Sequence, residues 1–222
     1  MSELFSIQLQ NRQQQGRDGV WLDLPTTTEQ VQAALRQIGI SSDNPQGLFI
    51  SGYFAEEEKR FAIPYNMVLA SNVDELNFLA ARLETLSAGE RAELNAALQA
   101  PQSELSSIGK ITDFPENVEY YVHLPEVRGP AQLGDYYLNR SGMVDMPEEW
   151  KGGIDTAQFG RYVAQQEQGA FTQYGYLVKS GDEWQKVHEG QPVPEEYRVL
   201  SFPAPEVLRD AANIPPPVQP ET

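Results

Sequence analysis

Carboxylates are the side chains of this sequence that could support chemistry, because several stand next to one another. Adjacent acids occur at Glu56–Glu58, Asp74–Glu75, Glu148–Glu149 and Glu195–Glu196. Two carboxylates at a fixed separation can serve as the acid and base of a glycoside hydrolase. Each group, however, falls in an expected loop or helix start, where solvation or the helix dipole accounts for it. A hydrolase would require one of these acids to sit in a closed pocket with a raised pKa.

Other catalytic and metal-binding residue types are scarce. The chain has no cysteine, which excludes disulfides and thiolate metal ligands, and its two histidines are His123 and His188. We interpret His123 as a structural residue of a strand and His188 as a solvated residue of a turn. The sequence contains no phosphate-binding glycine loop, metalloprotease motif or calcium-binding loop. It therefore indicates a noncatalytic protein without a cofactor or metal.

Net charge is the most informative property of the composition. The 222 residues include 32 acids and 16 bases, which gives a net charge of −16. Such a chain repels nucleic acid and anionic membranes and attracts basic surfaces, including those that bind DNA. At about one phosphate per ~1.7 Å of B-DNA, this number of carboxylates matches about 16 base pairs. High charge also serves solubility, and composition alone leaves that alternative open.

Targeting signals are missing from the sequence. No apolar run approaches the roughly 20 residues that cross a bilayer, and the first residues do not resemble a secretory signal. We therefore expect a cytoplasmic protein.

The elements that position the acids begin with a predicted sheet and helix. Alternating apolar residues over Leu4–Gln10 predict a strand, and Val20–Leu24 completes a hairpin with it. Thr26–Thr28 offer helix caps, Gly39 ends the helix, and Leu48–Phe54 predicts a third strand.

A helical hairpin is expected next. Ser71 or Asn72 caps the first helix, which has acids in its first turn, where the helix dipole favours them. Ser87 and Glu90 have the spacing of a capping box at the start of the second helix, which ends at Pro101.

The rest of the chain mixes helices and strands. We expect a short helix or turn at Leu105–Thr112, a strand at Asn117–Leu124 and a helix at Ala131–Asn139. A further helix is capped by Asp155 and ended by Gly169, and a strand follows at Phe171–Val178, with Gly175 as a bulge or close-approach point. The final strands are expected at Trp184–Val187 and Tyr197–Leu200. The fold class is thus α+β: an elongated chain of three small units, residues 1–70, 71–101 and 102–200, with an extended Pro-rich tail at 201–222 that includes a short amphipathic turn at Pro205–Ala212.

Several collinear segments resemble one protein family. Asp155, Phe159, Gly160, Arg161 and Ala164, followed by FT and YGY, resemble the C-terminal signature of the ArdA-type antirestriction proteins. The segments GVWLDLP, DELNFLAARLETLS and QLGDYYL resemble other parts of the same family. The family often has acids where this chain has Gly52, Phe54, Ala157 and Tyr162.

The resemblance implies a function. ArdA-like proteins are elongated dimers that mimic B-DNA and inhibit type I restriction-modification enzymes by occupying their DNA-binding channel, and they are encoded largely on mobile elements. The resemblance therefore implies that this chain forms a homodimer and binds such an enzyme. We expect it to bind neither nucleic acid nor a membrane. The missing acids favour an alternative, an acidic protein-interaction or scaffold protein with the same fold and no antirestriction activity.

Site residues follow from the charge and the resemblance. The acids that we expect to form the DNA-mimicking surface are Asp23, Glu29, Glu56, Glu57, Glu58, Asp74, Glu75, Glu84, Glu90, Glu93 and Glu167. The resemblance places Asp155, Phe159, Gly160 and Arg161 near a dimer contact and the antirestriction region. The alternative is that Gly160 and Arg161 serve packing within their own domain.

Overall fold

The computed structural model describes residues 4–14, 18–56, 60–101 and 103–205. Its strands are β1 (Phe5–Asn11), β2 (Val20–Leu24), β3 (Leu48–Phe54), β4 (Tyr121–Leu124), β5 (Ala170–Thr172) and β6 (Gly175–Lys179). Its α-helices are α1 (Thr28–Gln37), α2 (Tyr65–Ala70), α3 (Val73–Glu84), α4 (Ala88–Gln99), α5 (Ile108–Thr112), α6 (Pro130–Asp135), α7 (Glu148–Lys151) and α8 (Thr156–Glu167). The fold is mixed α and β, as predicted. Glu57, Glu58, the expected tail from residue 206 and most of the turn expected at Pro205–Ala212 lie outside the described residues.

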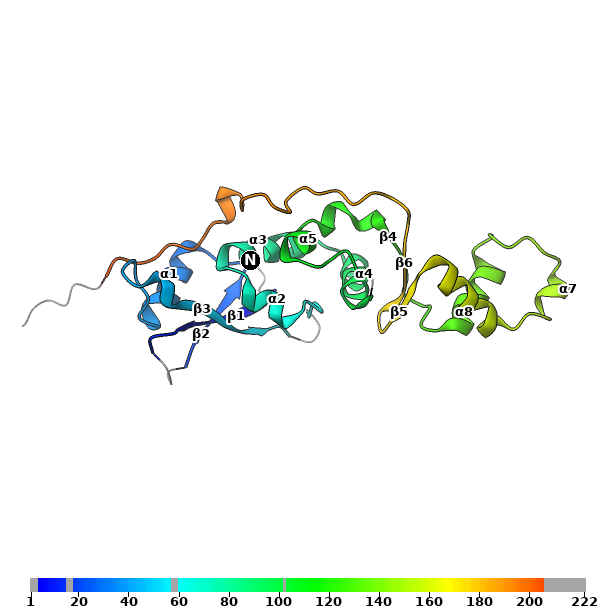
Figure 1. Ribbon diagram of the computed structural model, residues 1–222, viewed down its shortest axis with the longest axis horizontal. Helices are drawn as coiled ribbons and strands as arrows, with labels where there is room; N and C mark the ends of the chain where they lie inside the picture. The colour runs from blue at the N-terminus through cyan, green and yellow to red at the C-terminus, as the bar shows by residue number, and fades with distance from the viewer. Residues whose placement is uncertain (1–3, 15–17, 57–59, 102, 206–222) are drawn as a thin grey trace, which may run out of the picture.

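The molecule is elongated, with the first sheet and α1 at one end and α7 at the other (Figure 1). One cluster of buried apolar side chains extends from Leu4 to Val199. A second, smaller cluster contains Val127, Leu133, Ala164 and Tyr176. The division into three units with boundaries near residues 70, 101 and 200 stays a prediction.

The first sheet is antiparallel, with strand order β2-β1-β3. Phe5, Ile7 and Leu9 of β1 are buried on its inner face, and Val31 and Leu35 of α1 belong to the same core. The predicted hairpin, helix and third strand are confirmed. They form because apolar residues alternate along β1 and recur at helical spacing along α1.

Helices α3 and α4 confirm the predicted helical hairpin and its caps. The Glu75 amide donates to Asn72 Oδ1 at 2.9 Å, and the Asn72 amide donates to Glu75 Oε2 at 3.4 Å. Ser87 and Glu90 form the same reciprocal pair, with the Ser87 amide 2.7 Å from Glu90 Oε2. These capping boxes satisfy amides that have no partner within the helix.

The second sheet has the order β4-β6-β5, and it separates the two buried clusters. Because side chains alternate along a strand, Leu177 of β6 faces the large cluster and Tyr176 faces the small one. The prediction of one continuous strand over Phe171–Val178 is wrong, since β5 and β6 form a hairpin in which Thr172 pairs with Gly175. Gly175 has φ +129°, and a Cβ there would lie 2.5 Å from the Leu124 carbonyl oxygen, which confirms the predicted close approach.

Two further boundaries differ from the prediction. The expected strand at Asn117–Leu124 begins only at Tyr121, because residues 118–120 form a 3-10 turn. The expected helix at Ala131–Asn139 consists of α6 and a π-helical turn, Tyr136–Arg140.

The final strands predicted at Trp184–Val187 and Tyr197–Leu200 are wrong. After β6 the chain runs back along the central helices toward α1 (Figure 1), and its regular structure is a 3-10 turn at Glu195–Tyr197. We call residues 180–203 the return segment. Its backbone forms hydrogen bonds with side chains of α3 and of the segment after α5 rather than with a strand.

Candidate functional site

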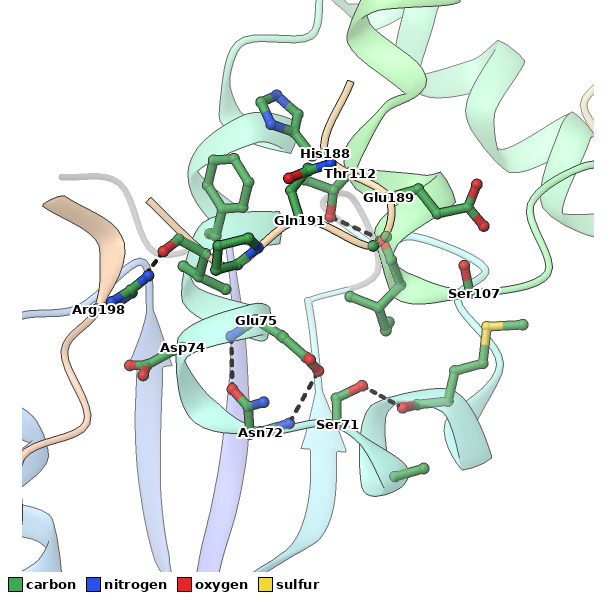
Figure 2. Close-up of a pocket in the computed structure, with 18 residues that line it drawn as sticks. Ser71, Asn72, Asp74, Glu75, Ser107, Thr112, His188, Glu189, Gln191 and Arg198 are labelled. Carbon is green, nitrogen blue, oxygen red and sulfur yellow. Dashed lines mark hydrogen bonds between the residues drawn. The ribbon is translucent and has the colours of Figure 1, made fainter. Parts of the chain in front are cut away.

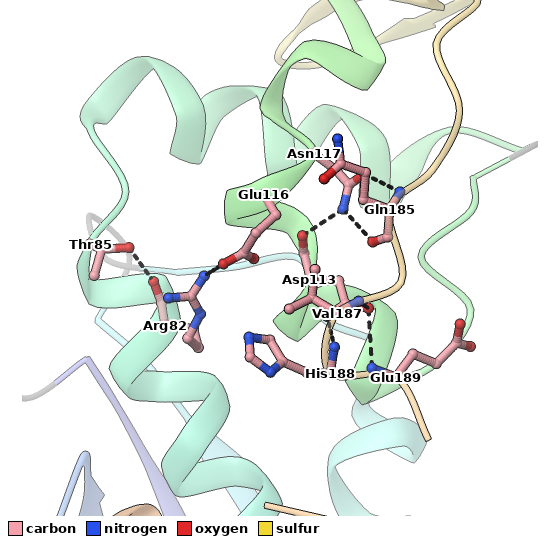
Figure 3. A network of polar contacts seen from close by, with 9 residues as sticks. All are labelled: Arg82, Thr85, Asp113, Glu116, Asn117, Gln185, Val187, His188 and Glu189. Atoms are coloured by element: carbon pink, nitrogen blue, oxygen red, sulfur yellow. Dashed lines mark hydrogen bonds and ion pairs between the residues drawn. The ribbon is translucent and has the colours of Figure 1, made fainter. Parts of the chain in front are cut away.

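A buried carboxylate holds the middle of the return segment (Figure 3). Asp113 is fully buried, and its oxygens accept the amides of residues 187, 188 and 189 at 3.3, 2.6 and 3.2 Å. Asn117, also buried, accepts the Gln185 amide at 2.7 Å and donates to the Gln185 carbonyl at 2.9 Å. Sequence reasoning missed both residues, because nothing local distinguishes them from other polar residues at a helix end.

A second pair of side chains fixes the end of the return segment. Asp74 Oδ1 accepts the amides of Val199 and Leu200, each at 2.7 Å. Asn77 donates to the Tyr197 carbonyl at 3.0 Å and accepts the Thr26 amide at 2.7 Å. Asp74 was expected on the DNA-mimicking surface, but its carboxylate binds backbone within its own chain.

A cavity of about 790 Å³ lies between the start of α3, α5 and the return segment (Figure 2). Its hydroxyls are engaged with backbone: Ser71 donates to the Met67 carbonyl at 2.7 Å, and Thr112 to the Ile108 carbonyl at 2.8 Å. Glu75, which also lines it, caps α3. Two acids of the cavity, Asp74 and Glu75, therefore already have structural bonds. The third, Glu189, pairs with Lys186 at 3.4 Å, and its Oε2 is buried without a hydrogen bond.

The two histidines have structural contacts. His123 Nε2 lies 2.9 Å from the Tyr174 carbonyl oxygen, which agrees with the interpretation of a structural residue. The expectation that His188 is simply solvated is wrong, because its half-buried ring packs edge-on against Phe78 at 4.9 Å between centroids. Within the described ranges, no group of three or more His, Asp or Glu residues is arranged to hold a metal ion.

Acids of the N-terminal sheet and the first helix face solvent. Asp23 is exposed and accepts the Ser6 hydroxyl at 2.6 Å. Glu29 is exposed in the first turn of α1, where a bond from its own amide and then one from Thr27 lower its pKa. Glu56, which follows β3, is also exposed, as is Glu84 at the end of α3. These positions place carboxylates in solvent.

Two acids of α4 differ in their ionisation. Hydrogen bonds with Ser87 lower the pKa of Glu90 and keep it charged. Burial, and then the neighbouring charge of Glu90, raises the pKa of Glu93 to about 7. One carboxylate oxygen of Glu93 is buried without a hydrogen bond. Glu93 therefore contributes less negative charge at neutral pH than its place among the expected acids implies.

Glu167, at the end of α8, points into the protein. Its Oε1 accepts the Tyr137 hydroxyl at 2.5 Å, and its Oε2 accepts the Tyr176 hydroxyl at 3.0 Å. Burial and this carboxylate together raise the pKa of both tyrosines. This acid thus links α8 to the π-helical turn that carries Tyr137 and to strand β6, which carries Tyr176.

The segment from Asp155 to Arg161 begins α8. Asp155 Oδ1 accepts the Gln158 amide at 2.9 Å, which confirms the predicted helix cap. Gly160 is buried against α6, where a Cβ would collide with the carbonyl oxygen of Pro130. Gly160 thus serves packing within the chain, one of the two roles left open above. Phe159 is half-buried, and Arg161 is exposed without an ion pair in the described part of the chain, so their role in a dimer contact stays a prediction.

The expected acids are not gathered into one site. Asp23 lies on β2, Glu29 in the first turn of α1, Glu56 after β3 and Glu167 at the end of α8, with the other described ones on the central helices α3 and α4. A family profile described as antirestriction protein (ArdA) matches residues 15–178. The chain belongs to the ArdA antirestriction family.

The ArdA match extends over the elements from β2 almost to the end of β6. Strand β1 and the return segment lie outside it, although both contribute to the large core. No curated protein matches this ArdA chain significantly. None of its helices in the described ranges is long and apolar enough to cross a membrane.

Proposed function

We propose that this ArdA protein is a noncatalytic mimic of B-DNA that occupies the DNA-binding channel of a type I restriction-modification enzyme. The molecule is elongated (Figure 1). The observation that carries the proposal is that exposed carboxylates occur from the first sheet to α7, along this whole length. Among the residues that the structure describes, the exposed acids are Asp18, Asp23, Glu29, Asp43, Glu56, Glu84, Glu119, Glu126, Asp145, Glu148, Glu149, Asp155, Asp182, Glu183, Glu195 and Glu196.

Six of the 16 bases form ion pairs within the described residues. Ion pairs join Arg82 to Glu116, Lys110 and Lys179 to Glu104, Arg140 to Asp135, Lys151 to Glu148, and Lys186 to Glu189. Each of these pairs also engages an acid, so the excess of 16 acids over bases remains, and acids predominate on the surface. A basic channel that binds DNA attracts such a surface through the same long-range field that attracts phosphates.

The proposal includes a homodimer that acts in the cytoplasm. Two chains would carry twice the 32 acids of one, and that number of carboxylates corresponds at most to the phosphates of about 32 base pairs at the density of B-DNA. Sedimentation of the purified protein would give a mass of two chains if this part of the proposal is correct.

Displacement of DNA tests the proposed function. Purified protein is titrated into a type I restriction-modification enzyme bound to a fluorescent duplex, and DNA release is followed by anisotropy at low salt. The proposal predicts complete, saturable release of the duplex. Absence of release by folded protein would reject it.

The alternative function is an acidic protein-interaction protein that shares the ArdA fold. It is favoured by Gly52 and Phe54, which stand on the first sheet where the family often has acids, and by the exposed Trp21 beside them. This alternative predicts no release of DNA in the same assay.

A further inference from the structure

The outer face of the first sheet carries two large aromatic side chains in solvent. Trp21 is 49% exposed and Phe54 is 57% exposed. Both lie on the face opposite the core, because Trp21 pairs with Gln8 and Phe54 pairs with Ser6, whereas the buried Ile7 points inward. We call Trp21, Phe54 and the strip of sheet between them the aromatic face.

The two rings form one surface rather than two isolated side chains. Their centroids are 6.4 Å apart with an edge-on arrangement. Gly52, on β3, also pairs with Gln8, and a Cβ there would lie 3.0 Å from Cη2 of Trp21. The indole of β2 therefore reaches across β1 to the strand that carries Phe54, over a position with no side chain.

Acids surround the aromatic face. Asp23 lies in the same row as Ser6 and Phe54, on the same face of the sheet. Asp18 precedes β2 and Glu56 follows β3, and both are exposed. The one cation that contacts an aromatic ring of this sheet in the described residues is Arg12, 5.2 Å from the centroid of Phe49 at the far end of β1.

This combination fits guanidinium groups. An aromatic ring attracts a cation over its face, and arginine also stacks on it, while nearby carboxylates balance the charge. A second copy of the chain is a less suitable occupant, because the proposed dimer contact is expected at the start of α8, toward the other end of the molecule. The segment from residue 206 to 222 fits poorly, since it has three acids, Glu206, Asp210 and Glu221, and one base, Arg209.

We propose that the aromatic face binds arginine side chains of the basic DNA-binding surface in the target enzyme. This inference rests on the proposed function and adds to it a contact of a different physical kind. Ion pairs between exposed groups weaken as salt rises, whereas ring contacts and apolar burial persist. The aromatic face thus supplies the part of the affinity that salt does not remove.

Two substitutions on the face and one matched control test the inference. Trp21→Ala and Phe54→Ala remove the rings one at a time, and Trp150→Ala removes a 66% exposed indole at the other end of the molecule. Release of fluorescent DNA from a purified type I enzyme is measured at low and at moderately high salt. We expect Trp21→Ala and Phe54→Ala each to weaken competition about 3-fold to 30-fold, by the same factor at both salts. Trp150→Ala should match the unsubstituted protein.

Several results would overturn the inference while the proposed function stands. Unchanged competition by both folded variants, or an equal loss with Trp150→Ala, would show that the face is not a specific contact. A changed sedimentation mass would assign it to contacts between copies of the chain. Stronger competition by a variant would assign it to another part of the same chain. If the unsubstituted protein releases no DNA, the proposed function itself fails. Circular dichroism and thermal unfolding establish that each variant is folded.

Discussion

At the scale of single residues, the acids of this chain differ in what their carboxylates bind. Asp74 and Asp113 accept backbone amides of the return segment, and Glu167 accepts two tyrosine hydroxyls. Glu29 and Glu90 stabilise helix starts through hydrogen bonds that also keep them ionised. Acidity in this protein therefore serves the fold as well as the surface.

Asp113→Ala should destabilise the protein strongly. The substitution leaves three backbone amides, which now bond to a fully buried carboxylate, without that acceptor. We expect the free energy of unfolding in urea to fall by about 2–4 kcal/mol. Asp145→Ala, at an exposed position, is the control and should change it by less than about 0.5 kcal/mol. Equal stability of the two variants would refute the anchoring role.

Glu93 predicts a pH dependence of stability. Its pKa is about 7 in the folded protein against an ordinary value of 4.5 for a glutamate, so between these pH values the folded state holds a proton that the unfolded state releases. The stabilisation is present at low pH and is lost as pH rises toward 7. We expect Glu93→Gln to raise the free energy of unfolding at pH 8 by about 1 kcal/mol, after allowance for partial exposure, and by less at pH 5.

The control for Glu93→Gln is Glu119→Gln, at an exposed position. This variant should follow the unsubstituted protein at both pH values. If Glu93→Gln gave the same stability difference at pH 5 and pH 8, the raised pKa would be ruled out.

At the scale of elements, local signals were readable and long-range ones were not. The capping boxes of α3 and α4 could be predicted because cap and partner stand three residues apart. Two stretches of the return segment, Trp184–Val187 and Tyr197–Leu200, were predicted as strands because their apolar residues suit a strand. The groups that hold the segment, Asp113 and Asp74, lie far away in the sequence. The number of acids was readable from the sequence, but which ones face solvent depended on those contacts.

Gly160→Ala should disrupt the packing of α8 on α6. A Cβ at this position collides with the backbone of Pro130 and lies 2.8 Å from the amide nitrogen of Gly134, so the two helices must separate. We expect a loss of at least about 2 kcal/mol, although alanine favours a helix over glycine. Hydrogen exchange should show the loss in α6 and α8, with β1 still protected.

Gly152→Ala is the matched control for this substitution. A Cβ at Gly152 meets nothing within 4 Å. Its stability should stay within about 0.5 kcal/mol of the unsubstituted protein. A Gly160→Ala protein as stable as Gly152→Ala would contradict the packing described for these helices.

At the scale of the whole molecule, the return segment joins the distal sheet to the N-terminal end. It runs from β6 along the central helices, and Ser42 near α1 donates its amide to the Pro203 carbonyl at 2.9 Å. This connection between the distal sheet and the N-terminal sheet and helix favours one elongated arrangement of the charged surface. A mimic of a stiff duplex needs such an arrangement, because its charges must meet those of the target together.

Distributed charge predicts small effects of single substitutions and large effects of grouped ones. Asp23→Asn removes one exposed charge and should weaken DNA competition less than about 3-fold, since each exposed ion pair contributes little. Neutralising Asp23, Glu29, Glu56 and Glu84 together should weaken it at least about 10-fold. A control that exchanges Asp for Glu, and Glu for Asp, at the same four positions keeps the charge and should keep the activity. Loss of inhibition by Asp23→Asn in a folded protein would instead indicate a discrete site.

The most direct test of DNA mimicry is the salt dependence of competition. The concentration of this protein that displaces half of the labelled duplex from a type I restriction-modification enzyme is compared with the concentration of unlabelled duplex that does so, over a series of salt concentrations. Direct binding to the enzyme is measured in parallel. The account predicts that the affinity of the enzyme for the protein falls steeply with salt, as its affinity for DNA does. Displacement that is independent of salt, or no displacement at any salt, would contradict it.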